Sequence, residues 1–137
     1  MGKNKIFLGG TCAETTWRND LIRTLNQIEY FNPVVKDWTP ECQQIEVDEK
    51  ENHCNIHFYC ITKEMQGVFS IAEVIDSVHN KSKRTILHVI PDGFEKFQLK
   101  SLQAVVDLVN SRGGIAYIDS QLHRSSRVLN NCFSIYE

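Results

Sequence analysis

Five short apolar segments alternate along the chain with helix-forming segments, and this order constrains the fold more than any other feature. The strand-like segments are residues 5–10, 30–35, 55–61, 85–91 and 115–119. The fourth of them, TILHVIP, is nearly continuous in apolar and β-branched residues, which is typical of a strand covered on both faces. Five repeats of strand and helix predict a parallel sheet with right-handed crossovers and helices on both of its faces.

Helix signals separate these strands. Thr39 and Pro40 are typical of an N-cap and a first helical position, and the glycine pair at 113–114 ends an amphipathic helix. Pro33 indicates that the second strand lies at a sheet edge or ends there. No repeat, low-complexity tract or linker interrupts the pattern. We therefore expect residues 1–137 to form one domain.

The composition is that of an ordinary globular protein, with 42% hydrophobic and 23% charged residues. A net charge of −2 gives no electrostatic case for binding a nucleic acid polymer or an anionic membrane. No apolar run approaches the roughly 20 residues of a membrane helix. The five cysteines are scattered without a C-x-x-C pair. We therefore expect reduced thiols, no metal site and a cytoplasmic location.

Glycines and polar residues follow the first three strands. Ligands of parallel α/β sheets bind beyond the carboxyl ends of strands, where the strand order reverses. The candidates are Gly9, Gly10 and Thr11 after the first strand, Asn32, Asp37 and Trp38 at or after the second, and residues 62–73 after the third. We expect these three groups to converge on one cleft.

Glu73 lies in an otherwise apolar helix start, GVFSIAEVID (67–76), and burying an unpaired carboxylate is costly. Two interpretations are open. Ser70 and Glu73 fit a capping box, in which Ser70 is the N-cap and Glu73 reaches back to a backbone N–H. Alternatively, Glu73 faces a ligand cleft and takes part in chemistry. Both interpretations place Glu73 in the first helical turn, where the helix dipole favours an ionised carboxylate.

The glycine loop at residues 9–11 is either a tight turn or a cradle of N–H groups for an anion or a sugar hydroxyl. It lacks the G-x-G-x-x-G pattern, which argues against a dehydrogenase. Trp17 and Arg18 contact a ligand, or Trp17 packs the first helix onto the sheet. Trp38 beside Asp37 stacks on a base, or covers a loop.

Three further features favour structural roles. His57 and His88 lie inside strands, so we expect hydrogen-bonded core histidines rather than catalysts. The acidic run at 46–51, EVDEKE, is typical of a solvated helix face.

Three blocks of sequence together resemble the nucleoside 2-deoxyribosyltransferase family, and most closely its short bacterial and phage members. The blocks are KIFLGGT with the following WR, then FNPVVKDW, then YCITKEMQGVFSIAEVID, and the resemblance runs from Lys5 to about Val109. It implies an α/β, flavodoxin-like or Rossmann-like three-layer sandwich with a five-stranded parallel sheet. It also implies a homodimer or a larger homo-oligomer.

By this resemblance, Glu73 is the glutamate that attacks C1′ of the deoxyribose. Gly67 and Ser70 fit the family pattern before that glutamate. The 9–11 loop and segment 32–38 would then line the base and sugar site. The ligand is a nucleoside or nucleotide, and no cofactor is required.

The second carboxylate of the family has no clear counterpart here. Other members carry an aspartate on the second helix, eight residues before the third strand, where this chain has Val47. Asp37, Asp48 and Glu51 are the alternatives. Other members also use an aromatic residue and a terminal carboxylate from a neighbouring subunit, and this chain ends in Tyr136 and Glu137.

The implied chemistry is cleavage of an N-glycosidic bond through a glycosyl-enzyme intermediate on Glu73. A second base would complete a transfer, and water would complete a hydrolysis. The leaving base needs a proton, for which Asp37 is the candidate. One alternative is a protein that binds a nucleotide or a nucleotide signal without turning it over. Another is an interaction protein on the same scaffold.

Overall fold

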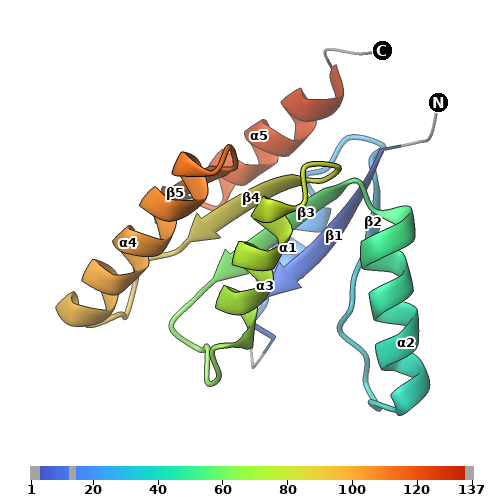
Figure 1. The fold of residues 1–137 in the computed structure, drawn as a ribbon, viewed down its shortest axis with the longest axis horizontal. Coiled ribbons are helices and arrows are strands. Elements are labelled where there is room, and N and C mark those ends of the chain that lie inside the picture. The colour runs from blue at the N-terminus through green and yellow to red at the C-terminus, as the bar shows by residue number, and fades with distance from the viewer. Residues whose placement is uncertain (1–3, 13–14, 135–137) are drawn as a thin grey trace.

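One parallel sheet organises the chain in this computed structural model, which describes residues 4–12 and 15–134. Its strands are β1 (Lys5–Gly10), β2 (Glu29–Phe31), β3 (Ile56–Ile61), β4 (Arg84–Val89) and β5 (Ile115–Ile118). The strand order is β2-β1-β3-β4-β5, and all four pairings are parallel (Figure 1). This order is that of a flavodoxin-like fold, so the predicted five-stranded parallel sheet is confirmed.

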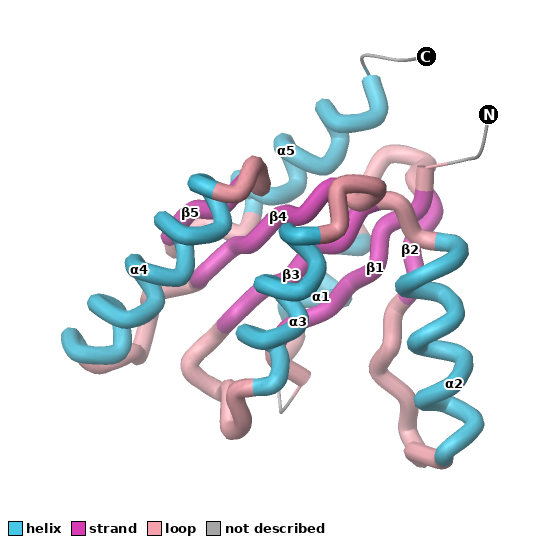
Figure 2. The backbone as a smooth tube through the Cα atoms, viewed as in Figure 1, coloured by secondary structure: helices cyan, strands magenta, loops and turns pink. Residues whose placement is uncertain are grey.

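Helices cover both faces of the sheet (Figure 2). They are α1 (Trp17–Ile22), α2 (Pro40–Asp48) with the π-helical turn η1 (Glu49–His53), α3 (Phe69–His79), α4 (Lys96–Ser111) and α5 (His123–Ser134). The helices α1 and α5 pack on one face, and α3 and α4 pack on the other. By contrast, α2 stands at the β2 edge and contains no buried residue (Figure 1).

Two apolar cores lie on the two faces of the sheet. Alternation along β1 sends Ile6 and Leu8 into the core under α1 and α5, and Phe7 into the core under α3 and α4. Because both faces are covered, every residue of β3 is buried. This explains why the central strands read as continuous apolar runs rather than as alternating patterns.

Several local predictions are confirmed. Thr39 caps α2, because its Oγ1 accepts a hydrogen bond from the Cys42 amide at 3.3 Å, and Pro40 is the first helical residue. The short strand β2 lies at the sheet edge, as Pro33 indicated. Gly113 follows α4 with a φ of +95°, a conformation that favours glycine at a helix end.

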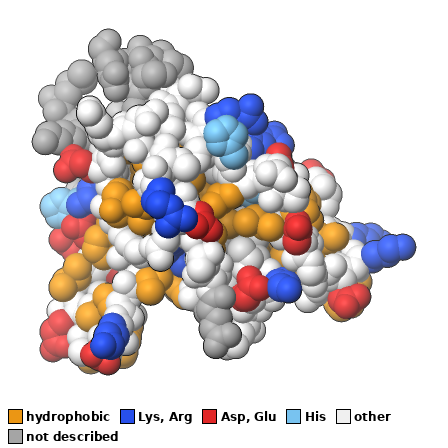
Figure 3. Space-filling view, turned by 180° about the vertical axis from the view of Figure 1, so that it is seen from behind, with side chains coloured by type: hydrophobic (Ala, Val, Ile, Leu, Met, Phe, Trp, Pro, Cys, Tyr) orange, Lys and Arg blue, Asp and Glu red, His pale blue; other side chains and the backbone are white. Residues whose placement is uncertain are grey.

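On the side away from α3 and α4, acidic and basic side chains mix closely with apolar ones (Figure 3). None of the helices within residues 4–12 and 15–134 combines the length and the apolar character needed to span a membrane. The predicted terminal residues Tyr136 and Glu137 lie outside the described residues.

Candidate functional site

The carboxyl ends of β1 and β3 are tied together where the strand order reverses. The Thr11 amide donates to the Cys60 carbonyl at 2.9 Å, and the Thr62 amide donates to Thr11 Oγ1 at 2.9 Å. Gly10 has a φ of +110°, and a Cβ there would lie 2.1 Å from the Cys60 carbonyl oxygen. Only glycine lets the two backbones approach this closely. Gly10 and Thr11 are therefore held against the end of β3, at the position where such sheets bind ligands.

The side chains of Trp17 and Arg18 bind the backbone at the end of β1 and just after it. Their exposed fractions are only 3% and 5%. The indole Nε1 and the guanidinium Nη1 both donate to the Thr11 carbonyl, at 2.9 and 2.7 Å, and Arg18 Nε donates to the Leu8 carbonyl at 2.9 Å. Burial lowers the pKa of Arg18. The two side chains position the loop, and direct contact with a ligand stays a prediction for both.

A small hollow of about 240 Å³ opens at this edge of the sheet. Its lining residues are Gly10, Thr11, Cys12, Met65, Gln66, Gly67, Phe69 and Ser70. The structure thus brings together four of the residues predicted to bind the substrate, from two segments of sequence. Gly9 lies within β1, where an added Cβ would be 2.6 Å from the Tyr59 ring, so its role here is close packing.

The predicted capping box at the start of α3 is wrong. The helix begins at Phe69 after Val68, whose carbonyl accepts from the Ile71 amide at 3.0 Å. Ser70 is therefore already inside the helix, and no side chain caps it. Glu73 is the fifth helical residue, too far along to reach the first N–H groups. Its carboxylate pairs with a cation instead.

That cation is Lys50, in the turn η1. Lys50 Nζ lies 3.0 Å from Glu73 Oε2, and the exposed fractions of the two side chains are 16% and 13%. The same Nζ lies 5.7 Å from the centroid of the Phe7 ring, which is on the sheet face that α3 and α4 cover. The pair is mostly withdrawn from water, so the attraction between its charges is stronger than at the surface. Glu73 is thus a mostly buried carboxylate whose charge is paired, which offsets the cost of its burial.

Tyr59 supplies a buried hydroxyl beside this ion pair. It lies on β3 with no exposed surface and lines the same small hollow as Lys50 and Glu73. Its hydroxyl makes no hydrogen bond of normal geometry among the described residues, and the Ser77 hydroxyl lies close enough to lower its pKa. Burial, and next the negative charge of Glu73, raise the pKa of Tyr59 well above its usual value, so the group stays a neutral donor. The hollow holds about 10 Å³, which leaves room for about one water beside this hydroxyl.

Glu46 is a second carboxyl group near Glu73. It lies on α2, one helical turn before Lys50 and therefore on the same side of the helix. Burial, and next the charge of Glu73, raise the pKa of Glu46, while Lys50 and Arg18 act in the opposite direction. The two carboxyl groups thus differ in their surroundings: the pKa of Glu46 is raised, and Glu73 is paired with a lysine.

Comparison with known protein families identifies the family of the chain. A family model described as nucleoside 2-deoxyribosyltransferase like matches residues 3–92, about two thirds of the chain. The chain belongs to this nucleoside 2-deoxyribosyltransferase-like family. A search of curated proteins finds no match. The matched region contains β1 to β4, and with them every group described above.

The earlier candidates for the family's second carboxylate lie in different surroundings. Asp48 is exposed, and its carboxylate accepts from Asn52 at 2.8 Å and pairs with His53 at 3.1 Å. The Asn52 bond is the main cause that lowers the pKa of Asp48. Glu51 is exposed but lines the hollow of Glu73. Asp37 is exposed in the connection before α2 and lines neither hollow.

Asn32 and Trp38, predicted for the same family site, also line neither hollow. Asn32 Oδ1 accepts from the Val34 amide at 3.0 Å, which shapes the turn after β2. Trp38 is 63% exposed. Their contact with a ligand stays a prediction.

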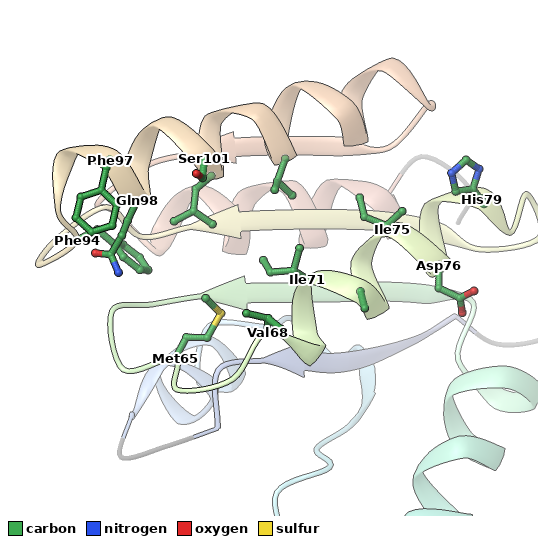
Figure 4. Close-up of a pocket in the computed structure, with 13 residues that line it drawn as sticks. Met65, Val68, Ile71, Ile75, Asp76, His79, Phe94, Phe97, Gln98 and Ser101 are labelled. Carbon is green, nitrogen blue, oxygen red and sulfur yellow. The ribbon is translucent and has the colours of Figure 1, made fainter.

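A larger groove lies on the other side of α3, against α4 (Figure 4). It holds about 910 Å³ and is lined mainly by apolar side chains, among them Ile71, Ile75 and Phe97. Its titratable side chains, Asp76 and His79, lie together at the end far from Phe97 (Figure 4). Glu73 does not line it. The groove and the hollow of Glu73 share only Asp76.

Sequence reasoning missed Glu46, Lys50 and Tyr59. Glu46 and Lys50 stand four residues apart in the acidic run, which is the spacing of neighbours on one helix face. Tyr59 is two residues after His57 in the same strand, so both face the same side of the sheet. These spacings were visible, but they did not show which face is covered.

Proposed function

We propose that the protein cleaves the N-glycosidic bond of 2-deoxyribonucleosides or their nucleotides, and transfers the deoxyribosyl group to a second base or to water. The observation that carries this proposal is Glu73 itself. It is a mostly buried carboxylate on α3, the helix that follows β3, with a cation at 3.0 Å. Membership of the family supports the same reaction class.

The reaction proceeds by double displacement at C1′. An oxygen of Glu73 bonds to C1′ as the bond from C1′ to the base nitrogen breaks. The electron pair of that bond leaves with the base, which takes a proton from an acid group. A nitrogen of a second base, or water, then attacks C1′ and releases Glu73, so that the configuration at C1′ is retained.

Two carboxyl groups are candidates for the proton donor. Glu46 is supported by its partial burial, by its place one turn before Lys50, and by the raised pKa that burial causes. Asp37 remains the candidate from sequence, and it is exposed. Glu46→Gln is expected to lose activity on natural nucleosides but to keep it on a 2-deoxyriboside with a leaving group that needs no proton. Asp37→Asn tests the rival assignment in the same two assays.

The hollow beside Ser70 is the proposed site for the outer part of the ligand. Thr11, Gly67 and Ser70 offer hydroxyl and backbone groups there to a sugar hydroxyl or a 5′-phosphate. Trp38 is the proposed stacking partner of the base. The Tyr59 hydroxyl is the proposed donor to an oxygen of the sugar or of Glu73, because it is buried without a partner in the part of the chain described.

The alternative function is binding without turnover. It is favoured by the ion pair itself, since Glu73 is already engaged by Lys50 at 3.0 Å. A binding protein predicts that deoxynucleotides raise the melting temperature while no base is released.

The deciding experiment incubates the protein with a panel of deoxynucleosides and their 5′-monophosphates, with and without a second base, and measures free and exchanged bases by mass spectrometry. Glu73→Gln is expected to lower the rate by at least about 10³-fold, as removal of a nucleophile does. Asp107→Asn on α4, an exposed carboxylate outside both hollows, is the matched control and should turn over normally. Base release that survives Glu73→Gln would contradict the proposal.

The homodimer or larger homo-oligomer implied by the resemblance is part of the same proposal. Light scattering at several protein concentrations checks it.

A further inference from the structure

We infer that Lys50 is the positioning residue of this site: it orients Glu73 and stabilises the Glu73 carboxylate as that group leaves C1′ in the second half of the reaction. This inference rests on the proposed function. The direct observation is the hydrogen bond from Lys50 Nζ to Glu73 Oε2 at 3.0 Å between two mostly buried side chains. Nothing in the sequence pattern of the family block around Glu73 contains this lysine.

The bond distinguishes the two oxygens of Glu73. Lys50 binds Oε2, which leaves Oε1 as the oxygen that attacks C1′ in the proposed reaction. In the first half, Oε1 bonds to C1′, the bond to the leaving base breaks, and the carboxylate becomes a neutral ester. In the second half, the acceptor nitrogen or water bonds to C1′ as the C1′–Oε1 bond breaks. The electron pair of that bond returns to Glu73, and the proton of the acceptor passes to the group that protonated the first base.

Lys50 therefore acts unequally on the two halves. Its charge stabilises the ionised carboxylate, which is the starting point of the first half and the product of the second. In the first half, Lys50 orients Glu73, but the attraction between their charges weakens as the carboxylate becomes an ester. The second half regains that attraction as charge returns to Glu73, in a site where burial strengthens it. Loss of the lysine should thus slow the breakdown of the ester more than its formation.

The backbone of Lys50 is fixed by a chain of buried hydrogen bonds. The Lys50 carbonyl can only accept, so His57 Nε2 carries the proton and donates to it at 2.8 Å. His57 Nδ1 then accepts from the Ser77 hydroxyl at 2.8 Å, and Ser77 Oγ accepts from the Thr85 hydroxyl at 2.6 Å. The chain runs from β4 through α3 and β3 to η1. A π-helical turn often marks a functional position, and here the chain holds that turn in place.

The test compares Lys50→Met, Lys50→Arg and Lys83→Met. Lys83 is a matched control, because its Nζ binds the same segment through the carbonyls of Glu51 and Cys54, at 2.7 and 2.8 Å. Each variant is mixed with a deoxynucleoside and quenched at successive times, and intact mass measures the fraction carrying a deoxyribosyl group. Lys50→Met is expected to accumulate the ester, with breakdown slowed about tenfold or more. Lys50→Arg and Lys83→Met should break the ester down nearly as fast as the wild type.

A second measurement needs no turnover. Urea unfolding of Lys50→Met, Glu73→Gln and the double variant forms a thermodynamic cycle. We expect the two changes to be non-additive, since each removes the same ion pair. Additive changes would overturn the inference.

The kinetic outcomes separate the two proposals. A wild type that neither releases base nor forms the ester overturns the proposed function and with it the kinetic role of Lys50. A wild type that turns over while Lys50→Met breaks the ester down at the normal rate overturns the role of Lys50 alone. Equal slowing by Lys83→Met also overturns it, because the effect would then come from the turn and not from the ammonium group.

Discussion

His57 and His88 form the same hydrogen-bonded arrangement on opposite faces of the sheet. Each lies in a central strand, with exposed fractions of 2% and 0%. Each Nε2 binds a backbone carbonyl and each Nδ1 binds a helix serine, at 2.8 and 2.8 Å for His57 and at 2.7 and 2.5 Å for His88. A second hydroxyl continues each chain, from Thr85 to Ser77 in one and from Tyr117 to Ser125 in the other. The expectation of hydrogen-bonded core histidines is therefore confirmed.

The difference lies in the residue that owns the final carbonyl. His57 binds the carbonyl of Lys50, whose side chain holds Glu73, whereas His88 binds the carbonyl of Asp119 just after β5. A buried polar chain of this kind joins elements of the fold wherever it occurs. The chain of His57 ends at Lys50, and His57 and Ser77 line the same hollow as Glu73. His88 therefore provides an internal control for stability effects.

The largest expected effect comes from replacing each histidine. His57→Leu and His88→Leu each remove two hydrogen bonds from a buried polar chain, one to a serine hydroxyl and one to a backbone carbonyl, so each should lower the free energy of unfolding by about 2 to 4 kcal/mol. Urea unfolding measures this loss. Only His57→Leu should also slow breakdown of the glycosyl-enzyme, measured on folded protein below the transition. An equal loss of activity in both variants would show that the His57 chain has no special link to the site.

A smaller effect should appear as a pH dependence of stability. Burial lowers the pKa of both histidines, and the bonds to the carbonyls oppose this only in part. Their contribution to stability is therefore complete above the unfolded value of about 6.5. It is lost as the pH falls through the lower values of the folded state, because the unfolded chain then binds more protons.

Melting temperatures between pH 7.5 and pH 5 measure this dependence. Each leucine variant should lose part of the slope below about pH 6.5. A slope that is the same in the wild type and in both variants would assign it to other groups.

The fold was more predictable than the site, for reasons that particular residues make clear. Burial on both faces gives strands such as TILHVIP a pattern that no other element shares, and Thr39 and Gly113 have direct backbone reasons for their places. The EVDEKE run fits a solvated helix face as well as it fits part of a site, because nothing in the sequence shows that η1 brings Lys50 toward α3. The capping box at Ser70 failed because a local pattern does not include a cation from another segment.

The smallest expected effect comes from removing one tyrosine hydroxyl on each face of the sheet, and it compares the two faces at the level of a single oxygen atom. The Tyr117 hydroxyl bonds to Ser125 at 2.6 Å, so Tyr117→Phe should cost about 1 kcal/mol of unfolding free energy. The Tyr59 hydroxyl is buried without a partner among the described residues, so Tyr59→Phe should leave stability unchanged or slightly raised. The same change should lower kcat/KM about tenfold, if this hydroxyl serves the ligand or Glu73. A clear loss of stability in Tyr59→Phe would mean that the hydroxyl has a structural partner in solution, and the buried polar groups of the two faces would then be equivalent.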